Sequence, residues 1–321
     1  MEQFTDRIAV VTGGGTGMGR ELVRQLSAEG CHVALCDVNE ETMAETVSLA
    51  EKEAPAGTRL NTFVADVSDE GQFQAFRDHV TSELATDHVH LVFNNAGIGG
   101  GGSFIADERD SWERTFGICW GGVYNGCRAF LPLLVASDGG HVVNVSSVNG
   151  FWASIGPFTP HTAYSAAKFA VRGFTEALLT DLRLNAPHVQ AHVVMPGHIG
   201  TSIVLNSAAI HGHRPEDMTA EDLQRMRETA ARLGMDTSTV TDDELRGFMQ
   251  VRGEMFRDAA PTTAEQAATI ILDGVRAGQW RILVGADAAV MDRRVRAEPE
   301  QAYEAGFFED VIREGGMNLG M

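Results

Sequence analysis

Residues 7–20 read RIAVVTGGGTGMGR, and this stretch decides the fold class of the chain. An apolar run typical of a buried strand leads into the glycine-rich turn TGGGTGMG at 12–19, after which helical periodicity begins. Glycine is needed where a strand turns tightly into a helix and where the backbone must approach a pyrophosphate. The free N–H groups and the positive dipole end of the helix then face that anion. Because the glycines lie between a strand and a helix, the stretch predicts a dinucleotide-binding βαβ unit rather than a flexible loop.

The same rhythm of strand and helix continues along the chain. Short apolar runs alternate with longer segments of helical periodicity, which is typical of a parallel sheet covered by helices on both faces. The strand candidates are 7–13, 32–37, 60–66, 90–97, 141–147, 189–197 and 280–285. Right-handed crossovers between them give a doubly wound α/β fold. We therefore expect one domain over 1–321, with about seven parallel strands and a C-terminal extension at 290–321.

One connection, between the sixth and seventh strand candidates, is far longer than usual. Within it Thr219 and Thr241 each precede acidic residues, a pattern that starts a helix. Thr262, with Glu265 three residues later, opens the helix before the last strand in the same way. The two inserted helices would each have an apolar face, formed by Leu223, Met226 and Leu233 in the first and by Leu245, Phe248, Met249 and Met255 in the second. This predicts a substrate-binding helical lid inserted at 202–260.

The composition is that of a soluble globular protein, with 44% hydrophobic and 21% charged residues and a net charge of −19. That charge disfavours nucleic acid and anionic membranes as partners. No apolar run reaches the roughly 18 residues of a membrane-spanning helix, and the first strand starts too early to leave room for a signal peptide. The four cysteines form no CxxC pair, so we expect reduced thiols in a cytoplasmic protein.

The positions of the acidic and histidine residues predict which dinucleotide the chain binds and whether it binds a metal ion. Asp37 ends the second strand candidate, where a carboxylate accepts hydrogen bonds from the adenosine ribose and repels a 2′-phosphate. No lysine or arginine follows at positions 38 and 39, so NAD is expected in preference to NADP. Asp66, at the end of the third strand, is a weaker candidate for the adenine edge. His198, His211 and His213 are scattered histidines without the ligand set of a metal site, so no metal is expected.

A tyrosine and a lysine stand four residues apart in Tyr164-Ser-Ala-Ala-Lys168, at the start of a long helical segment. This spacing places both side chains on one helical face. An ammonium beside a phenol lowers the pKa of the phenol, which makes tyrosine a usable general base near neutral pH. Ser147 ends the fifth strand candidate and can steady a substrate oxygen. Taken singly these residues are ordinary, because a tyrosine and a lysine four apart are usually only surface neighbours.

Together these motifs resemble the short-chain dehydrogenase/reductase family, over about 1–201 and again over about 261–290. The resemblance rests on TGGGTGMG, Asp37, Asp66-Val67, NNAG at 94–97, Ser147, YSAAK at 164–168 and PGHIGT at 196–201. It implies a Rossmann fold, with Tyr164 as the general acid/base, Lys168 lowering its pKa and holding the nicotinamide ribose, and Ser147 orienting the substrate oxygen. The cofactor-binding residues that it implies are Thr12, Gly13, Gly15, Thr16, Gly17, Met18, Gly19, Asp37, Asp66, Val67, Asn94, Ala96, Gly97, Tyr164, Lys168, Pro196, Gly197, Ile199 and Thr201.

The chain departs from the family pattern at Cys119, within TFGICWGGVY at 115–124. The family has an asparagine there, the fourth member of its catalytic set, which bends the helix and helps to place a water that relays protons from the lysine. A cysteine is a poor hydrogen-bond partner, but its backbone carbonyl remains available to that water. Gly121 and Gly122 would also permit a local irregularity in the helix.

A second departure is a loop between Ser147 and Tyr164 that is about four residues longer than the family pattern. The loop borders the substrate in the family, so its aromatic residues either form an apolar wall of the pocket or pack as a surface loop. The expected substrate-pocket residues are Phe151, Trp152, Ile155, Phe158 and His198.

These observations lead to one main functional hypothesis and two alternatives. The main hypothesis is an NAD-dependent dehydrogenase/reductase that interconverts a fairly large, apolar secondary alcohol and its ketone. The alternatives are a 3-oxoacyl-type ketoreductase, disfavoured because both partners would be acidic, and a catalytically weak dinucleotide-binding sensor, supported only by Cys119. The family resemblance also implies a homo-oligomer, tetramer or dimer, through the helices at about 112–136 and 163–185.

Overall fold

The computed structural model describes residues 3–156, 159–232 and 234–315, and its centre is a parallel sheet of seven strands. The sheet order is β3-β2-β1-β4-β5-β6-β9. The strands are β1 (Ile8–Thr12), β2 (His32–Asp37), β3 (Leu60–Val64), β4 (Leu91–Asn94), β5 (Gly140–Val145), β6 (Val189–Pro196) and β9 (Arg281–Val284). This confirms the doubly wound Rossmann fold, whose strand order reverses between β1 and β4, so that a crevice opens at the carboxyl ends of these strands.

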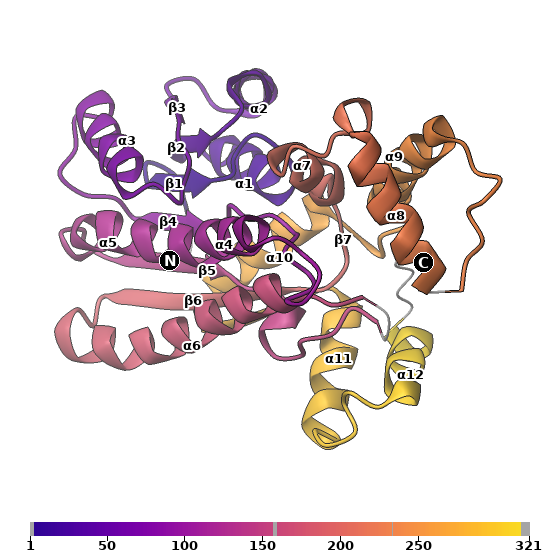
Figure 1. Cartoon of the computed structure of the whole chain (residues 1–321). Coiled ribbons are helices and arrows are strands. Elements are labelled where there is room, and N and C mark those ends of the chain that lie inside the picture. Colours follow the sequence, from indigo (N-terminus) through magenta and orange to yellow (C-terminus); the bar gives the residue numbers. More distant parts are fainter. Residues whose placement is uncertain (1–2, 157–158, 233, 316–321) are drawn as a thin grey trace.

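Helices cover both faces of the sheet, as Figure 1 shows. One layer contains α1 (Gly17–Ala28), α2 (Glu40–Glu53) and α10 (Ala264–Arg276); the other contains α3 (Glu70–Glu83), α5 (Gly122–Val135) and α6 (Thr162–Asn185). Successive residues of a strand pack against opposite helix layers: Val10 packs toward α3, α5 and α6, whereas Val11 packs toward α1 and α10. The strands are therefore apolar on both faces, which explains their continuous hydrophobic runs.

The inserted segment leaves and rejoins the domain at one place. β7 (Ile199–Gly200) pairs in parallel with β8 (Thr262–Thr263), and between them lie α7 (Ile203–Ile210), α8 (Ala220–Arg232) and α9 (Asp242–Asp258). These three helices stand at one end of the sheet, beyond the carboxyl ends of its strands (Figure 1).

The inserted helices α8 and α9 begin near their predicted positions, whereas the start of the helix after the insertion, α10, differs from the prediction. Thr241 and Glu244 form a capping box at the start of α9, and Thr219 precedes α8. The helix α10 begins one residue later than predicted, because Thr263 and Gln266 form its capping box rather than Thr262 and Glu265. Thr262 is instead buried in β8.

The predicted apolar faces of the insertion form a small core only in part. Leu223 and Leu245 are buried together with Met218, and Met226 and Met249 pack against them. Phe248 and Met255, by contrast, are about half exposed, and Leu233 lies outside the described residues. The face of α9 that they share is directed away from that core.

The C-terminal extension contains two helices, α11 (Ala286–Ala297) and α12 (Ala305–Gly315), which pack against each other below the inserted segment in Figure 1. Their apolar side chains join those of β6 and of the loop after β5 in a separate core cluster. Among the helices of the described residues, none has the length and apolar character needed to cross a membrane.

Candidate active site

The glycine-rich turn after β1 has the close approaches that its sequence predicts. Gly13 and Gly17 have φ values of +65° and +54°, which side chains other than glycine rarely adopt. A Cβ on Gly13 would lie 2.9 Å from the backbone of Ala96, and a Cβ on Gly19 would lie 1.9 Å from the carbonyl oxygen of Gly13. The turn thus brings the start of α1 tightly against the end of β4, where only bare backbone fits.

Hydrogen bonds fix the turn to the carboxyl ends of the neighbouring strands. The Thr12 hydroxyl accepts hydrogen bonds from the backbone N–H groups of Asn95 and Ala96, each at 3.0 Å. Asn94, at the end of β4, donates from Nδ2 to Asn144 Oδ1 of β5 at 2.8 Å. These hydrogen bonds hold the carboxyl ends of β1, β4 and β5 in fixed positions around the crevice.

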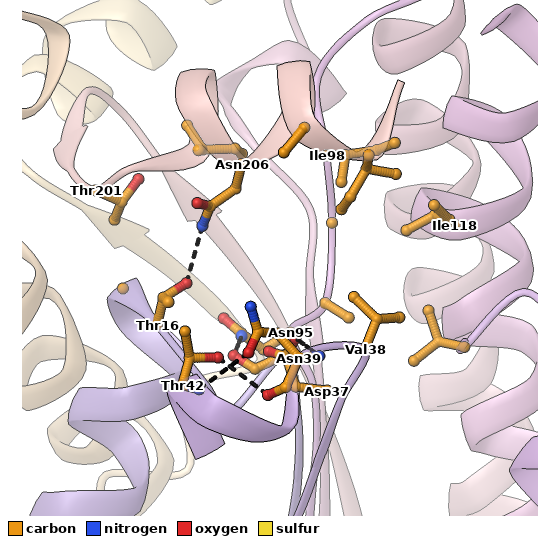
Figure 2. A pocket seen from close by; sticks show the side chains of 18 of the residues that line it. Thr16, Asp37, Val38, Asn39, Thr42, Asn95, Ile98, Ile118, Thr201 and Asn206 are labelled. Carbon is orange, nitrogen blue, oxygen red and sulfur yellow. Dashed lines mark hydrogen bonds between the residues drawn. The ribbon is translucent and has the colours of Figure 1, made fainter. Parts of the chain in front are cut away.

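A cavity of about 380 Å³ lies over this arrangement, between the glycine turn and α7 (Figure 2). Ten residues that the sequence predicts for cofactor binding line it: Gly13, Thr16, Gly17, Met18, Asp37, Asp66, Val67, Ala96, Gly97 and Thr201. The others that line it were not predicted: Val38, Asn39, Thr42, Ala65, Asn95, Ile98, Ile118, Ile203, Asn206, Ala209, Ile210 and Arg214. Asn95 stands inside the NNAG motif, whereas the last five come from the inserted segment, for which no motif gave a signal.

Asp37 is held at the edge of the glycine turn. Its Oδ2 accepts a hydrogen bond from the backbone of Gly15 at 3.0 Å, and its Oδ1 accepts one from the backbone of Asn39 at 3.2 Å. Asn39 in turn caps α2 by accepting from the N–H of Thr42 at 3.1 Å (Figure 2). These two hydrogen bonds hold the carboxylate at the carboxyl end of β2, where it lines the cavity.

Asp66 is also fixed, after β3. Its Oδ1 accepts from the backbone and the hydroxyl of Ser68, at 2.9 and 2.6 Å. Its Oδ2 lies 3.6 Å from the guanidinium of Arg114 on α4 (Arg109–Phe116). The cavity therefore has a second carboxylate along the same edge of the sheet.

Tyr164 and Lys168 lie on one face of the first turns of α6, as their spacing predicts. The Lys168 Nζ is 5.3 Å from the centroid of the Tyr164 ring and donates a hydrogen bond to the Val145 carbonyl at 2.9 Å. Burial raises the pKa of Tyr164 above its ordinary value, and the charge of Lys168 and the Ser147 side chain offset only part of that rise. The His161 ring packs against the Tyr164 ring at 4.7 Å between centroids. The structure thus brings Ser147, Tyr164 and Lys168 together, although none of them lines the cavity itself.

Cys119 lies in a π-helical turn, Gly117–Gly121, between α4 and α5. Its side chain is fully buried, and its Sγ donates to the Ile98 carbonyl at 3.2 Å. A Cβ on Gly97 would lie 3.4 Å from the Lys168 Nζ and 3.6 Å from the Cys119 Sγ, so Gly97 stands between these two side chains. The predicted helix irregularity is present, and Cys119 and Lys168 lie on either side of Gly97.

The loop after Ser147 does not provide the expected wall through Phe151 and Trp152. Trp152 is buried, its Nε1 donates to the Ala302 carbonyl at 2.7 Å, and its ring packs against Phe307 and Phe308. Phe151 belongs to the same cluster. Both side chains therefore belong to the core formed with the C-terminal helices α11 and α12.

Of the other three expected pocket residues, the two that the structure describes do not line the cavity. Ile155 is partly buried and does not line the cavity, and Phe158 lies outside the described residues. His198 is buried away from the cavity: its backbone donates to Asp287 at 2.6 Å and its Nε2 lies 2.7 Å from the Phe256 carbonyl.

Some predicted cofactor-binding residues support the cavity without lining it. Pro196 ends β6, Ile199 lies in β7, and Gly197 leaves room for the Asp287 carboxylate. Gly15 presents its N–H to Asp37, as described above. The four cysteines are buried free thiols, and the described residues contain no cluster of three or more histidine, cysteine or acidic side chains that fits a metal ion.

Comparison with known proteins gives the family. Residues 7–210 match the family model described as short chain dehydrogenase. The chain is a short-chain dehydrogenase/reductase. This family consists of oxidoreductases, and the chain shares with it the sheet, the glycine turn and the tyrosine–lysine pair.

Relatives of this short-chain dehydrogenase/reductase cover most of its length. It is 36% identical to the SadH protein of Mycobacterium tuberculosis over 293 residues, 91% of each chain. It is 36% identical to levodione reductase of Leifsonia aquatica over 214 residues, which are 64% of this chain and 74% of the relative.

Solved structures of the family agree with the fold. A Burkholderia phymatum short-chain dehydrogenase/reductase in complex with NAD is 28% identical and superposes with a TM-score of 0.72, covering 94% of this chain and 96% of its own. A metagenomic short-chain oxidoreductase in complex with NADP is 27% identical with a TM-score of 0.54, over 60% of this chain and 83% of its own.

Proposed function

We propose that this chain is an NAD-dependent oxidoreductase that interconverts a fairly large, apolar secondary alcohol and its ketone. The observation that carries the proposal is the buried Lys168 ammonium 5.3 Å from the centroid of the Tyr164 ring, with the Ser147 side chain beside the phenol. A dinucleotide in the neighbouring cavity would supply the hydride acceptor or donor. The bare glycine backbone and the ribose-directed Asp37 fit that group.

The roles of the chain's own residues follow from this arrangement. Tyr164 removes the hydroxyl proton of an alcohol or returns it to a ketone, and the positive charge of Lys168 stabilises the phenolate that this requires. Ser147 holds the substrate oxygen in hydrogen-bonding reach of the phenol. Since Lys168 also bonds the Val145 carbonyl, its ammonium stays in place whether or not substrate is bound.

The substrate class is supported by the apolar content of the inserted segment and by the relation to levodione reductase. Ile98, Ile203 and Ile210 give the α7 side of the cavity an apolar surface. Asp37 supports NAD in preference to NADP, because its carboxylate repels a 2′-phosphate. We place the protein in the cytoplasm, where its buried free thiols remain reduced.

The test is NADH consumption with a panel of short and bulky ketones, for the wild type and for Tyr164→Phe. We expect turnover with bulky apolar ketones and a loss of about 10²- to 10⁴-fold in the variant, the usual contribution of a general acid or base. Equal rates in the two proteins would refute the mechanism. Turnover of short ketones alone would refute the substrate class.

We also propose a homo-oligomer formed through α5 and α6. These helices expose apolar side chains, with Tyr124 and Val135 on α5 and Phe169 and Leu184 on α6. Light scattering after size-exclusion chromatography tests this, and a monomer at micromolar concentration would contradict it.

A further inference from the structure

Arg214 is an exposed arginine of the inserted segment, four residues beyond the end of α7, and it lines the dinucleotide cavity. The other ionisable residues that line the described cavity are Asp37 and Asp66. None of the ion pairs within the described residues involves Arg214, whereas Arg225 on α8 pairs with both Glu108 and Asp222. The cavity thus contains two carboxylates and one cation, and that cation is not neutralised by another side chain of the described residues.

The inserted segment is held directly over the glycine turn. The Asn206 Nδ2 donates to the Thr16 hydroxyl at 3.1 Å, and Thr16 is the N-cap of α1 (Figure 2). On the other side of α7, the Ser207 hydroxyl accepts from the Gly99 N–H at 2.8 Å, and His211 Nε2 lies 3.0 Å from the Gly99 carbonyl. These contacts fix α7 above the turn, and the chain reaches Arg214 three residues after His211.

The glycine turn itself offers a phosphate no free basic side chain. Arg20 on α1 donates to the Gly15 carbonyl, to Thr46 and to Glu45, so its guanidinium is already engaged. A pyrophosphate carries two negative charges into a cavity that already contains the carboxylates of Asp37 and Asp66, of which, within the described residues, only Asp66 is paired with an arginine, Arg114. The helix dipole and the N–H groups of the turn offset only part of that repulsion.

We propose that Arg214 binds the pyrophosphate of the dinucleotide, so that the inserted segment takes part in cofactor binding. This inference rests on the proposed function, since it requires that the cavity holds a dinucleotide. A guanidinium suits a phosphate because its donors form charge-assisted, bidentate hydrogen bonds. A 2′-phosphate is the less suitable partner, because the ribose end of the cavity is bounded by the fixed carboxylate of Asp37.

The test is isothermal titration calorimetry of NAD⁺, ADP, adenosine and NADP⁺ with the wild type, Arg214→Ala and Arg214→Lys. Arg252→Ala is the matched control, because Arg252 is an exposed arginine of α9 that does not line the cavity. We expect Arg214→Ala to weaken NAD⁺ and ADP about tenfold or more, the loss of one charge-assisted contact, and to leave adenosine unchanged. Arg214→Lys should recover part of the affinity, and the control should match the wild type.

The salt dependence gives a second readout. Affinity of the wild type for ADP should fall more steeply with ionic strength than that of Arg214→Ala, because one ionic contact is missing in the variant. Thermal melting checks that the variants are folded, as expected for a change at an exposed position.

Distinct outcomes separate the two proposals. Unchanged ADP and NAD⁺ affinity in Arg214→Ala, with a wild type that binds both, would overturn the inference and leave the proposed function standing. A loss confined to NADP⁺ would also overturn it, since Arg214 would then contact the 2′-phosphate. A wild type that binds neither ADP nor NAD⁺ would overturn the proposed function and the inference with it.

Discussion

The Cys119 thiol donates a hydrogen bond to the backbone carbonyl of Ile98 across 3.2 Å, from the middle of a π-helical turn. This contact joins the π-helical turn to the segment after β4, in which Ile98 lines the dinucleotide cavity. The backbone irregularity is present although the residue is a cysteine, so the local conformation does not depend on an asparagine side chain.

Cys119→Asn should therefore fold and stay active. The amide is a stronger donor for the Ile98 carbonyl than a thiol, but the site is fully buried and must accept two more heavy atoms. We expect kcat within about tenfold of the wild type, equivalent to a change of about 1.4 kcal/mol in the barrier. Melting temperature and steady-state rates measure both effects. A folded variant without any activity would mean that the thiol itself takes part in the reaction.

Asp37→Ala should lower the affinity for NAD⁺ about tenfold and reduce the discrimination against NADP⁺. Asp37→Asn is the matched variant, because it retains a hydrogen-bond acceptor for the Gly15 N–H and removes the charge. If repulsion of the 2′-phosphate is the cause, both variants relax the discrimination. Dissociation constants for the two cofactors measure it, and an unchanged preference would show that the ribose is recognised elsewhere.

The pH dependence of alcohol oxidation should follow the ionisation of Tyr164. Burial raises the pKa of Tyr164 and the Lys168 charge lowers it, so removing that charge moves the pKa further upward. In Lys168→Met we expect the rise of kcat with pH to move to higher pH by about one unit or more. Lys168→Arg retains the charge and should shift the profile less. Identical profiles in wild type and Lys168→Met would show that another group titrates.

The two histidines buried between β5 and β6 should make the fold sensitive to mild acid. His141 Nδ1 lies 2.9 Å from His192 Nε2, and burial lowers their pKa values to about 3 and about 4, against about 6.5 when unfolded. Below about pH 6.5 the unfolded chain therefore binds protons that the folded chain does not. The free energy of unfolding should fall as the pH drops from 6.5 toward 4.

A variant tests the assignment of this acid sensitivity. Each histidine contributes a slope of up to about 1.4 kcal/mol per pH unit in that range. His141→Gln should reduce the slope by up to about 1.4 kcal/mol per pH unit, as measured by urea unfolding between about pH 5 and about pH 7. An unchanged slope would place the titration on other groups.

Trp152→Ala should act on stability rather than on substrate binding. The ring packs against Phe307 and Phe308, and its truncation in a core costs about 3–5 kcal/mol. Trp152→Phe keeps most of the packing and loses the hydrogen bond to the Ala302 carbonyl, at a cost of about 1 kcal/mol. Urea unfolding measures both. A large rise in KM for Trp152→Phe, without a change in the free energy of unfolding, would show instead that the ring contacts the substrate.

The sequence predicts the sheet and the glycine turn well because their signals are local. The alternation of buried strands with helices and the position of Asp37 at a strand end need no knowledge of distant contacts. The tyrosine and lysine of α6 are likewise fixed by a spacing of four on one helix.

The predictions from the sequence that failed depend on packing between distant parts of the chain. Trp152 turns toward Ala302 and Phe307, about 150 residues along the chain, and no local pattern indicates which of two apolar surfaces an aromatic loop contacts. For the same reason Asn206 and Arg214 carried no sequence signal, since their place over the cavity depends on how the insertion folds back onto the glycine turn.

The contacts that hold α7 also set how often the cavity opens. Three hydrogen bonds, from Asn206, Ser207 and His211, must break before α7 can lift from the glycine turn and from Gly99. At about 1 kcal/mol net for each, the open form would be populated at about 1% or less. Nucleotide exchange would then wait for a rare opening, so the rates of cofactor binding and release would depend on these three hydrogen bonds.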